Sequence, residues 1–167
     1  MITLEKLSSF CNVLNQNGVK YILIGGCAVI LHGLERPTYD IDFLIENTEE
    51  NINRIKKALL TYLDVDTVKE ITPDMFRKYK VVRVGLGDYY VDFMTQIGDV
   101  DYKVAESDAY IEKINNVEIP VAGLDTMIKL KQGFPESDIK DRLFLEGKKH
   151  YLKEKRGNEK YKGGSNI

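Results

Sequence analysis

Residues 19–45 constrain the fold of this chain more than any other segment. Residues 19–24 form a β-branched and aromatic run that ends at Gly25 and Gly26, which is the pattern of a buried strand. Residues 40–45 begin by alternating polar and apolar side chains and predict a second strand. This second strand is apolar enough to be buried, yet two aspartates lie at its start. Their negative charges need a positive group nearby to offset them. We therefore expect a sheet that carries a functional site.

The rest of the sequence alternates helical and extended patterns. Apolar residues at helical spacing predict helices over residues 3–15, 27–34, 49–63, 101–109, 124–132 and 137–151. Strand pairs are predicted at residues 80–86 with 89–95, around Gly87-Asp88, and within residues 111–121, around Asn115-Asn116. Gly133, Phe134 and Pro135 separate the last two helices. This pattern indicates the α+β class.

Composition narrows the possible functions. The 167 residues are 43% hydrophobic, enough for one packed domain, and 24 Lys+Arg against 26 Asp+Glu argue against a dedicated duplex-DNA binder. The two cysteines are too few for a disulfide framework and fit a reducing cytosol. There is no signal-like start and no apolar run of the ~18 residues that a membrane span needs. We expect a cytoplasmic protein.

The C-terminal part differs in character from the rest. We expect a core over residues 1–122 and a helical segment over residues 123–167 that packs on the core as one domain. Residues 148–162 form a basic tail with seven Lys/Arg and two acids. Such a run is usually a solvated face, and RNA or an acidic protein partner is the alternative.

The carboxylates Asp40 and Asp42 carry the chemistry. Side chains two apart on a strand share one face, so these two lie side by side. A divalent cation removes their repulsion, and carboxylate oxygens suit Mg²⁺, with Mn²⁺ as a substitute. Asp92 lies in another strand pattern and joins them if the two strands are neighbours. Alternatively, Asp92 pairs with Arg83 or a lysine.

A glycine pair and a polar loop supply the other half of the site. Gly25 and Gly26, between a strand and a helix, allow a phosphate to approach the backbone. Arg36 has the fork that suits phosphate, or it pairs with an acid. Thr38 caps the loop or orients Asp40. A triphosphate beside metal-holding acids indicates phosphoryl or nucleotidyl transfer.

Residues 25–42 read Gly-Gly-x-Ala-x-x-x-His-Gly-x-x-Arg-x-Thr-x-Asp-x-Asp. This string resembles the nucleotidyltransferase superfamily, whose fold is shared by DNA polymerase β and antibiotic-adenylylating enzymes. It is most similar to a small bacterial branch that includes the abortive-infection AbiEii-type toxins. Residues 124–129 and 140–142 also resemble that branch, and the likeness covers most of residues 19–146.

The resemblance implies a mixed, twisted sheet with flanking helices. It also implies transfer of a nucleoside monophosphate from an NTP to a hydroxyl acceptor, with release of pyrophosphate. Asp40 and Asp42 would hold the metals, and Asp92 would bind the catalytic metal or take the proton of the attacking hydroxyl. Gly25 and Gly26 would cradle the triphosphate.

The C-terminal lysines are further nucleotide-binding candidates. Lys129 and Lys131 are two apart on a helix, so at most one faces the site, and Lys129, within the stretch that resembles the bacterial branch, is the candidate. Lys140 is either a phosphate ligand or a solvated helix residue. His32 lies between apolar residues and is better explained as a packed histidine than as a catalytic one.

Several alternatives stay open at this point. The acceptor could be a small hydroxylated compound, as in antibiotic modification, a tRNA end or a protein side chain, as in toxin–antitoxin pairs. A catalytically silent nucleotide-binding or toxin–antitoxin partner module would keep the fold. A phosphohydrolase would use the same metal but release phosphate. The intact set of Asp40, Asp42 and Asp92 favours the enzyme, because a silent module has no need of a repulsive pair.

Overall fold

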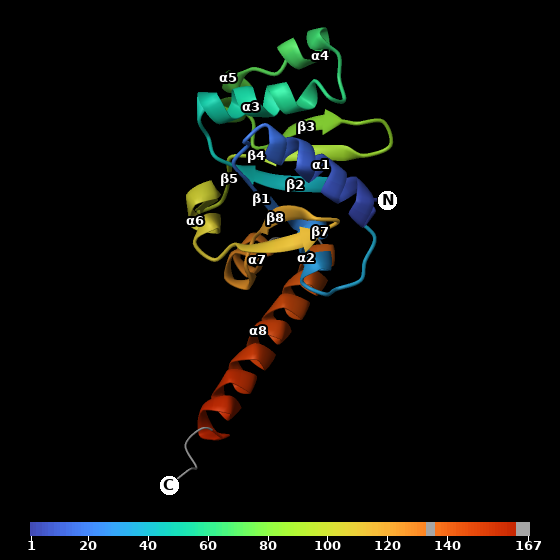
Figure 1. Cartoon of the computed structure of the whole chain (residues 1–167). Coiled ribbons are helices and arrows are strands. Elements are labelled where there is room, and N and C mark those ends of the chain that lie inside the picture. The colour runs from blue at the N-terminus through green and yellow to red at the C-terminus, as the bar shows by residue number, and fades with distance from the viewer. Residues whose placement is uncertain (133–135, 163–167) are drawn as a thin grey trace.

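The computed structural model of the chain describes residues 1–132 and 136–162 (Figure 1). The described residues form a six-stranded mixed sheet. Its strands run in the order β3 (Val82–Gly85), β4 (Tyr90–Met94), β2 (Asp40–Ile45), β1 (Tyr21–Ile24), β8 (Val117–Val121) and β7 (Tyr110–Ile114). β2 pairs parallel with β4, β1 pairs parallel with β8, and the other pairs are antiparallel. The expected α+β fold with a mixed sheet is confirmed.

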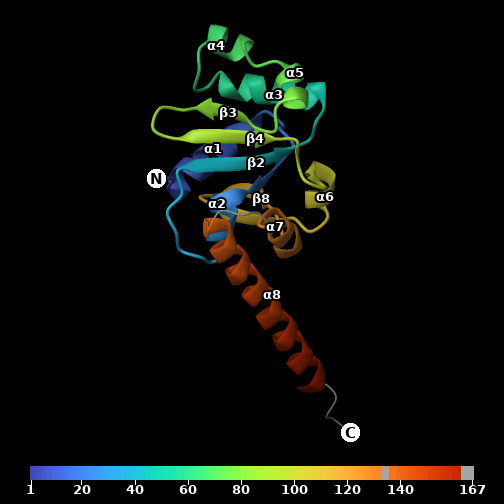
Figure 2. The same ribbon diagram turned by 180° about the vertical axis from the view of Figure 1, so that it is seen from behind.

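Helices cover both faces of this sheet (Figures 1 and 2). They are α1 (Leu4–Gln16), α2 (Gly25–Leu31), α3 (Glu49–Leu59), α4 (Val65–Lys69), α5 (Pro73–Lys78), α6 (Tyr102–Glu106), α7 (Leu124–Leu130) and α8 (Glu136–Lys162). α1 crosses one face and α7 lies on the other, while α2 continues from the end of β1 at the edge of the two layers. No helix in the two described ranges is both long and apolar enough to span a bilayer.

An aromatic cluster on the α1 side fixes which face of β2 and β4 is buried. Phe43 of β2 lies 5.9 Å from Phe10 of α1 and 5.9 Å from Phe93 of β4, measured between ring centroids. Because strand side chains alternate, Asp42 and Asp92, the residues before these two phenylalanines, point to the opposite face. The packing of the core therefore directs the acids away from α1 and toward α2.

Local signals in the sequence form the expected caps and turns. The Thr3 side chain accepts a hydrogen bond from the backbone of Lys6 at the start of α1. Thr48 does the same for Asn51 at the start of α3. Asn115 and Asn116 adopt positive φ angles of 50° and 64° between β7 and β8, as a two-residue hairpin requires. The two predicted hairpins are confirmed.

Several boundaries differ from the sequence-based expectation. α2 begins at Gly25, so the glycine pair forms the first turn of the helix and is not a separate turn before it. α3 ends at Leu59, and the short helices α4 and α5 that follow were not predicted. Neither was the small hairpin of β5 (Gln96–Ile97) and β6 (Val100–Asp101). Elements this short contain too few residues to show an apolar period.

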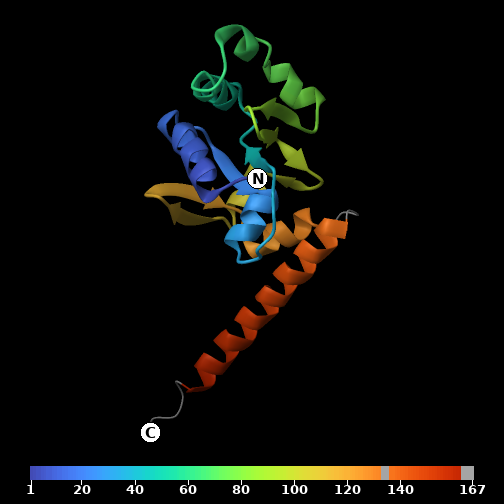
Figure 3. The same cartoon turned by 90° about the vertical axis from the view of Figure 1, so that its right-hand side faces the viewer.

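The C-terminal helix is longer than expected. α8 runs to Lys162, past the predicted end at residue 151, and its last turns project away from the sheet (Figure 3). α7 and α8 pack against each other. The predicted break at Gly133, Phe134 and Pro135 lies outside the described residues.

A buried asparagine that the sequence did not indicate ties α3 to the sheet. The Asn51 side chain is 1% exposed. Its Oδ1 accepts from the backbone N–H of Lys20 at 2.7 Å, and its Nδ2 donates to the carbonyls of Lys20 at 2.9 Å and Glu46 at 3.0 Å. Asn51 thus connects the residue before β1 to the residue after β2, at one end of this strand pair.

Candidate functional site

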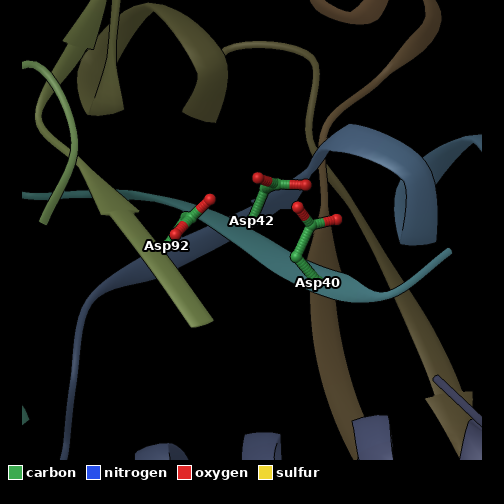
Figure 4. Close-up of side chains that lie close together, drawn as sticks. All are labelled: Asp40, Asp42 and Asp92. Atoms are coloured by element: carbon green, nitrogen blue, oxygen red, sulfur yellow. The ribbon is translucent and has the colours of Figure 1, made fainter. Parts of the chain in front are cut away.

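Strand pairing brings the three predicted carboxylates together. Asp42 and Asp92 are register partners on the parallel strands β2 and β4, and Asp40 lies two residues before Asp42. The side chains project from one face of the sheet toward each other (Figure 4), and one oxygen from each lies within 4.8 Å of the others. The expected convergence is confirmed.

The cluster carries more negative charge than its surroundings favour. The Asp92 side chain is buried, at 6% exposed, and Asp40 and Asp42 are partly buried. Burial, together with the charges of Asp40 and Asp92, raises the pKa of Asp42 to about 7, against an opposite effect of Lys131 and Arg83. Additional positive charge beside this carboxyl would favour its ionised form.

Arg83 on β3 already supplies one positive charge. Its Nε lies 2.8 Å from Asp92 Oδ1 and its Nη2 2.7 Å from Asp92 Oδ2, a two-bond fork. The same Nη2 lies 3.3 Å from Asp40 Oδ2. The pairing with Arg83 that the sequence left as an alternative therefore exists alongside the carboxylate cluster.

The donor set fits a divalent cation. Three carboxylates that face one point provide only oxygen ligands, which suit Mg²⁺ and Mn²⁺ and not softer metals. Asp40, Asp42 and Asp92 are the residues that would hold such an ion. Their surplus negative charge after pairing with one arginine gives the ion an electrostatic reason to bind.

Close packing explains the glycine pair. Gly25 has a φ of +67°, and a Cβ there would lie 2.0 Å from Asp42 Oδ2. A Cβ on Gly26 would lie 2.5 Å from Thr38 Oγ1 and 2.8 Å from Arg36 Nη1. The two glycines let the start of α2 lie directly against the acids and the polar loop.

These residues line one cavity of about 230 Å³. Its lining comprises Ile24, Gly25, Gly26, Arg36, Thr38, Asp40, Asp42, Met94, Ile97, Leu130 and Lys131. The predicted candidates Gly25, Gly26, Arg36, Thr38, Asp40 and Asp42 are thus brought to one place. Asp92 does not line the cavity. It lies beside Asp42, its register partner on the neighbouring strand.

The lysines divide differently from the prediction. Lys129 is exposed on α7 and Lys140 is exposed on α8, and neither lines the cavity. Lys131, which follows the last residue of α7, does line it. The expectation that at most one of Lys129 and Lys131 faces the site holds, but Lys131 lines the cavity and the predicted candidate Lys129 does not. The spacing of the two residues gave no signal to choose between them.

A buried aspartate on α8 fixes two cations at the cavity. Asp141 is 1% exposed, and its Oδ2 lies 3.3 Å from Arg36 Nη1 and 3.2 Å from Lys131 Nζ. Lys131 Nζ also lies 2.7 Å from Asp138 Oδ1. Asp141 lies within residues 140–142, which resemble the bacterial branch, but its burial could not be predicted because it depends on how α8 packs.

Two further residues each have two candidate roles from the sequence. Thr38 is buried, and its Oγ1 lies 3.4 Å from the backbone carbonyl and 3.5 Å from the Oδ1 of Asp40, so its contacts fit both the loop and the carboxylate. His32 is buried, with Nε2 2.8 Å from the carbonyl of Ala122, and burial lowers its pKa. His32 is therefore a packed, hydrogen-bonded histidine that does not line the cavity.

Comparisons with known proteins agree with this geometry. A sequence model of the family described as "Nucleotidyltransferase of unknown function (DUF6036)" matches residues 3–128. A structure from Thermotoga maritima, described as that of a candidate nucleotidyltransferase, is similar with a TM-score of 0.54 at 15% identity, over 90% of this chain and 92% of that one. An antigenic nucleotidyltransferase-like protein from Paracoccidioides brasiliensis gives 0.54 at 15% identity, over 85% and 74%. At this identity the structures show a shared fold. The curated protein sequences gave no match.

Proposed function

The chain belongs to the DUF6036 family of nucleotidyltransferases, and from this membership we propose that it moves a nucleoside monophosphate from an NTP to a hydroxyl acceptor, releasing pyrophosphate. The observation that carries the proposal is a single cavity lined both by carboxylates, Asp40 and Asp42, and by the cations Arg36 and Lys131. An NTP needs both kinds of group, because its phosphates bind cations and its reacting phosphorus needs a metal ion beside it.

Asp40, Asp42 and Asp92 would hold Mg²⁺ or Mn²⁺. When bound, such an ion stabilises negative charge on the attacking and leaving oxygens of an in-line displacement. Thr38 keeps the Asp40 carboxylate oriented toward the cluster. Asp92 would complete the metal site or accept the proton of the attacking hydroxyl.

Arg36 and Lys131 would bind the triphosphate. Arg36 and Lys131 are held at the cavity by Asp141, so their positive charges are in place before a ligand arrives. There they would offset the charge that builds up on the departing pyrophosphate. Gly25 and Gly26 have no side chains to exclude the phosphates from the backbone. The acceptor would be a small hydroxylated compound, a tRNA end or a protein side chain.

Thermal unfolding with each of the four NTPs, with and without Mg²⁺, tests the proposal. An NTP at about a hundred times its Kd would stabilise the fold by about 2.7 kcal/mol. We expect an Mg²⁺-dependent rise in Tm with at least one NTP in the wild type and none in the Asp40→Asn/Asp42→Asn double variant. An Asp66→Asn/Asp74→Asn double variant removes the same charge from exposed positions and serves as the control.

The products separate transfer from hydrolysis. With the NTP that raises Tm and an acceptor hydroxyl present, a nucleotidyltransferase forms the acceptor–NMP ester and releases pyrophosphate, whereas a phosphohydrolase releases phosphate without an acceptor. Absence of any Mg²⁺-dependent rise, or a rise that survives in the Asp40→Asn/Asp42→Asn variant, would overturn the proposal.

A further inference from the structure

Arg83 does not line the cavity, but it contacts the carboxylate cluster. It lies on β3 directly opposite Asp92 in the antiparallel β3–β4 register. Its guanidinium bonds both oxygens of Asp92 at 2.8 and 2.7 Å and one oxygen of Asp40 at 3.3 Å. One arginine thus bridges two of the carboxylates that would hold the metal.

The surroundings of Arg83 leave it free to move. Its side chain is 52% exposed, whereas that of Asp92 is 6% exposed. The guanidinium carbon lies 5.1 Å from the centroid of the Tyr90 ring, at an open edge of the sheet. If the fork opens, Asp92 stays fixed in the sheet, while Arg83 can swing into solvent or toward an anion.

Charge makes Arg83 and a divalent cation competitors for the same oxygens. A positive charge within a few ångströms of a cation site weakens binding of the cation. A triphosphate changes this balance, because it adds metal ligands and gives the displaced guanidinium a new anionic partner.

We propose that Arg83 is a positioning residue that serves as the counter-ion of the carboxylates until the nucleotide brings the divalent cation. Metal and triphosphate then bind as a coupled pair, and the metal alone binds weakly. This inference rests on the proposed function, since it concerns the same carboxylates. By linkage, whatever strengthens metal binding through the triphosphate strengthens triphosphate binding through the metal by the same factor.

Mn²⁺ titrations followed by electron paramagnetic resonance test this coupling in the wild type and in Arg83→Gln. We expect the variant to bind Mn²⁺ alone about tenfold more tightly or better, because one repelling charge is gone. In a titration with an equimolar mixture of Mn²⁺ and inorganic tripolyphosphate, the Mn²⁺ affinities of the two proteins should differ less. Arg77→Gln removes an exposed arginine that pairs with Asp74 and controls for the change in net charge.

The dependence of Tm on Mn²⁺ distinguishes the proposed role of Arg83 from a purely structural one. Without metal, Arg83→Gln leaves the carboxylates unpaired, so its Tm should lie below that of the wild type at pH about 8. Saturating Mn²⁺ should close this gap. A gap that is the same with and without Mn²⁺ would show that Arg83 only supports the fold and would overturn the inference. Arg83→Lys keeps the charge without the fork and should show an intermediate Mn²⁺ affinity, which provides a second variant if Arg83→Gln does not fold.

The outcomes separate this inference from the proposed function. Equal Mn²⁺ affinities in the wild type and Arg83→Gln, or weaker binding by the variant, would overturn the role of Arg83 and leave the metal site standing. If neither protein bound Mn²⁺, alone or with tripolyphosphate, the metal site itself would fail, and the proposed function would fall with the inference.

Discussion

Arg36, in the loop before β2, contacts Asp141 on α8 across 105 positions of sequence, with Nη1 3.3 Å from Oδ2. The same carboxylate oxygen lies 3.2 Å from Lys131 Nζ. Asp141 therefore joins the polar loop, the end of α7 and the start of α8 through the two cations that line the cavity. The C-terminal helices help to build the candidate site.

Removal of the Asp141 charge should destabilise the protein. In Asp141→Asn, two partly buried cations lose a buried partner, and we expect a cost of about 3 kcal/mol in the free energy of unfolding. Asp125→Asn, which removes an exposed partner of Lys149, should cost under about 1 kcal/mol. Urea unfolding measures both, and equal costs would show that the buried network contributes nothing special.

The metal-free protein should become less stable as the pH rises toward neutrality. Burial beside Asp40 and Asp92 raises the pKa of Asp42 from 3.8 to about 7, so in this range the folded state holds a proton that the unfolded chain releases. The stabilising contribution is complete below pH about 4 and is lost as the pH rises through about 7. Asp42→Asn cannot titrate and should lack this contribution.

The difference between wild type and Asp42→Asn isolates the effect from other titrating groups. Unfolding in a chelator from about pH 5 to about pH 8 should show the wild type losing stability relative to the variant. A difference that stays flat across this range would contradict the raised pKa.

A side chain at residue 25 should disrupt the site. Gly25→Ala puts a Cβ 2.0 Å from Asp42 Oδ2 at a φ of +67°, so Asp42 or the start of α2 must shift. We expect a cost of about 1–3 kcal/mol and loss of Mn²⁺ binding. Gly147→Ala is the control, because its Cβ meets nothing within 4 Å inside a helix, and it should stabilise the fold by up to about 1 kcal/mol. Normal Mn²⁺ binding by a folded Gly25→Ala would argue against close approach at this position.

The two lysines at the end of α7 should differ in nucleotide binding. Lys131→Met removes a cation that lines the cavity and should weaken NTP binding by about tenfold or more. Lys129→Met changes an exposed residue outside the cavity and should leave the Kd within about twofold. Ligand-induced Tm shifts over an NTP concentration series give both constants. A larger effect at Lys129 would restore the choice made from the sequence.

The asparagine under α3 should matter for stability alone. Asn51→Ala removes three part-buried hydrogen bonds to backbone groups and should cost about 3 kcal/mol. Asn53→Ala, at an exposed position of the same helix, should change stability by under about 0.5 kcal/mol. Calorimetric unfolding of the two variants makes the comparison, and similar Tm values would contradict the bridging role of Asn51.

Local signals explain the part of the fold and site that could be predicted. Asp40 and Asp42 alternate with Ile41 and Phe43, which are fully buried. The two-residue period of the strand therefore predicted which side chains face the core and which face the site. The hairpin at Asn115-Asn116 required only residues that tolerate positive φ. These features depend on neighbours a few positions away, which a single sequence displays.

Long-range packing decides the part that could not be predicted. Whether Lys129 or Lys131 enters the cavity depends on the rotation of α7 against the sheet, and the burial of Asp141 depends on α8. Arg83 could be assigned both as a partner of Asp92 and as a contact of Asp40 only once β3 and β4 had a register. Such choices involve residues far apart in the chain, and their spacing carries no signal for them.

The order of these residues along the chain also sets an order in time during synthesis. Asp40, Arg83 and Asp92 leave the ribosome before Lys131 and Asp141, because they precede them in the sequence. Asp92 and Arg83 can pair as soon as β3 and β4 have been made, whereas Lys131 lines the cavity and pairs with Asp141 only after α7 and α8 have followed. The cavity is therefore completed by the last part of the chain to be synthesised.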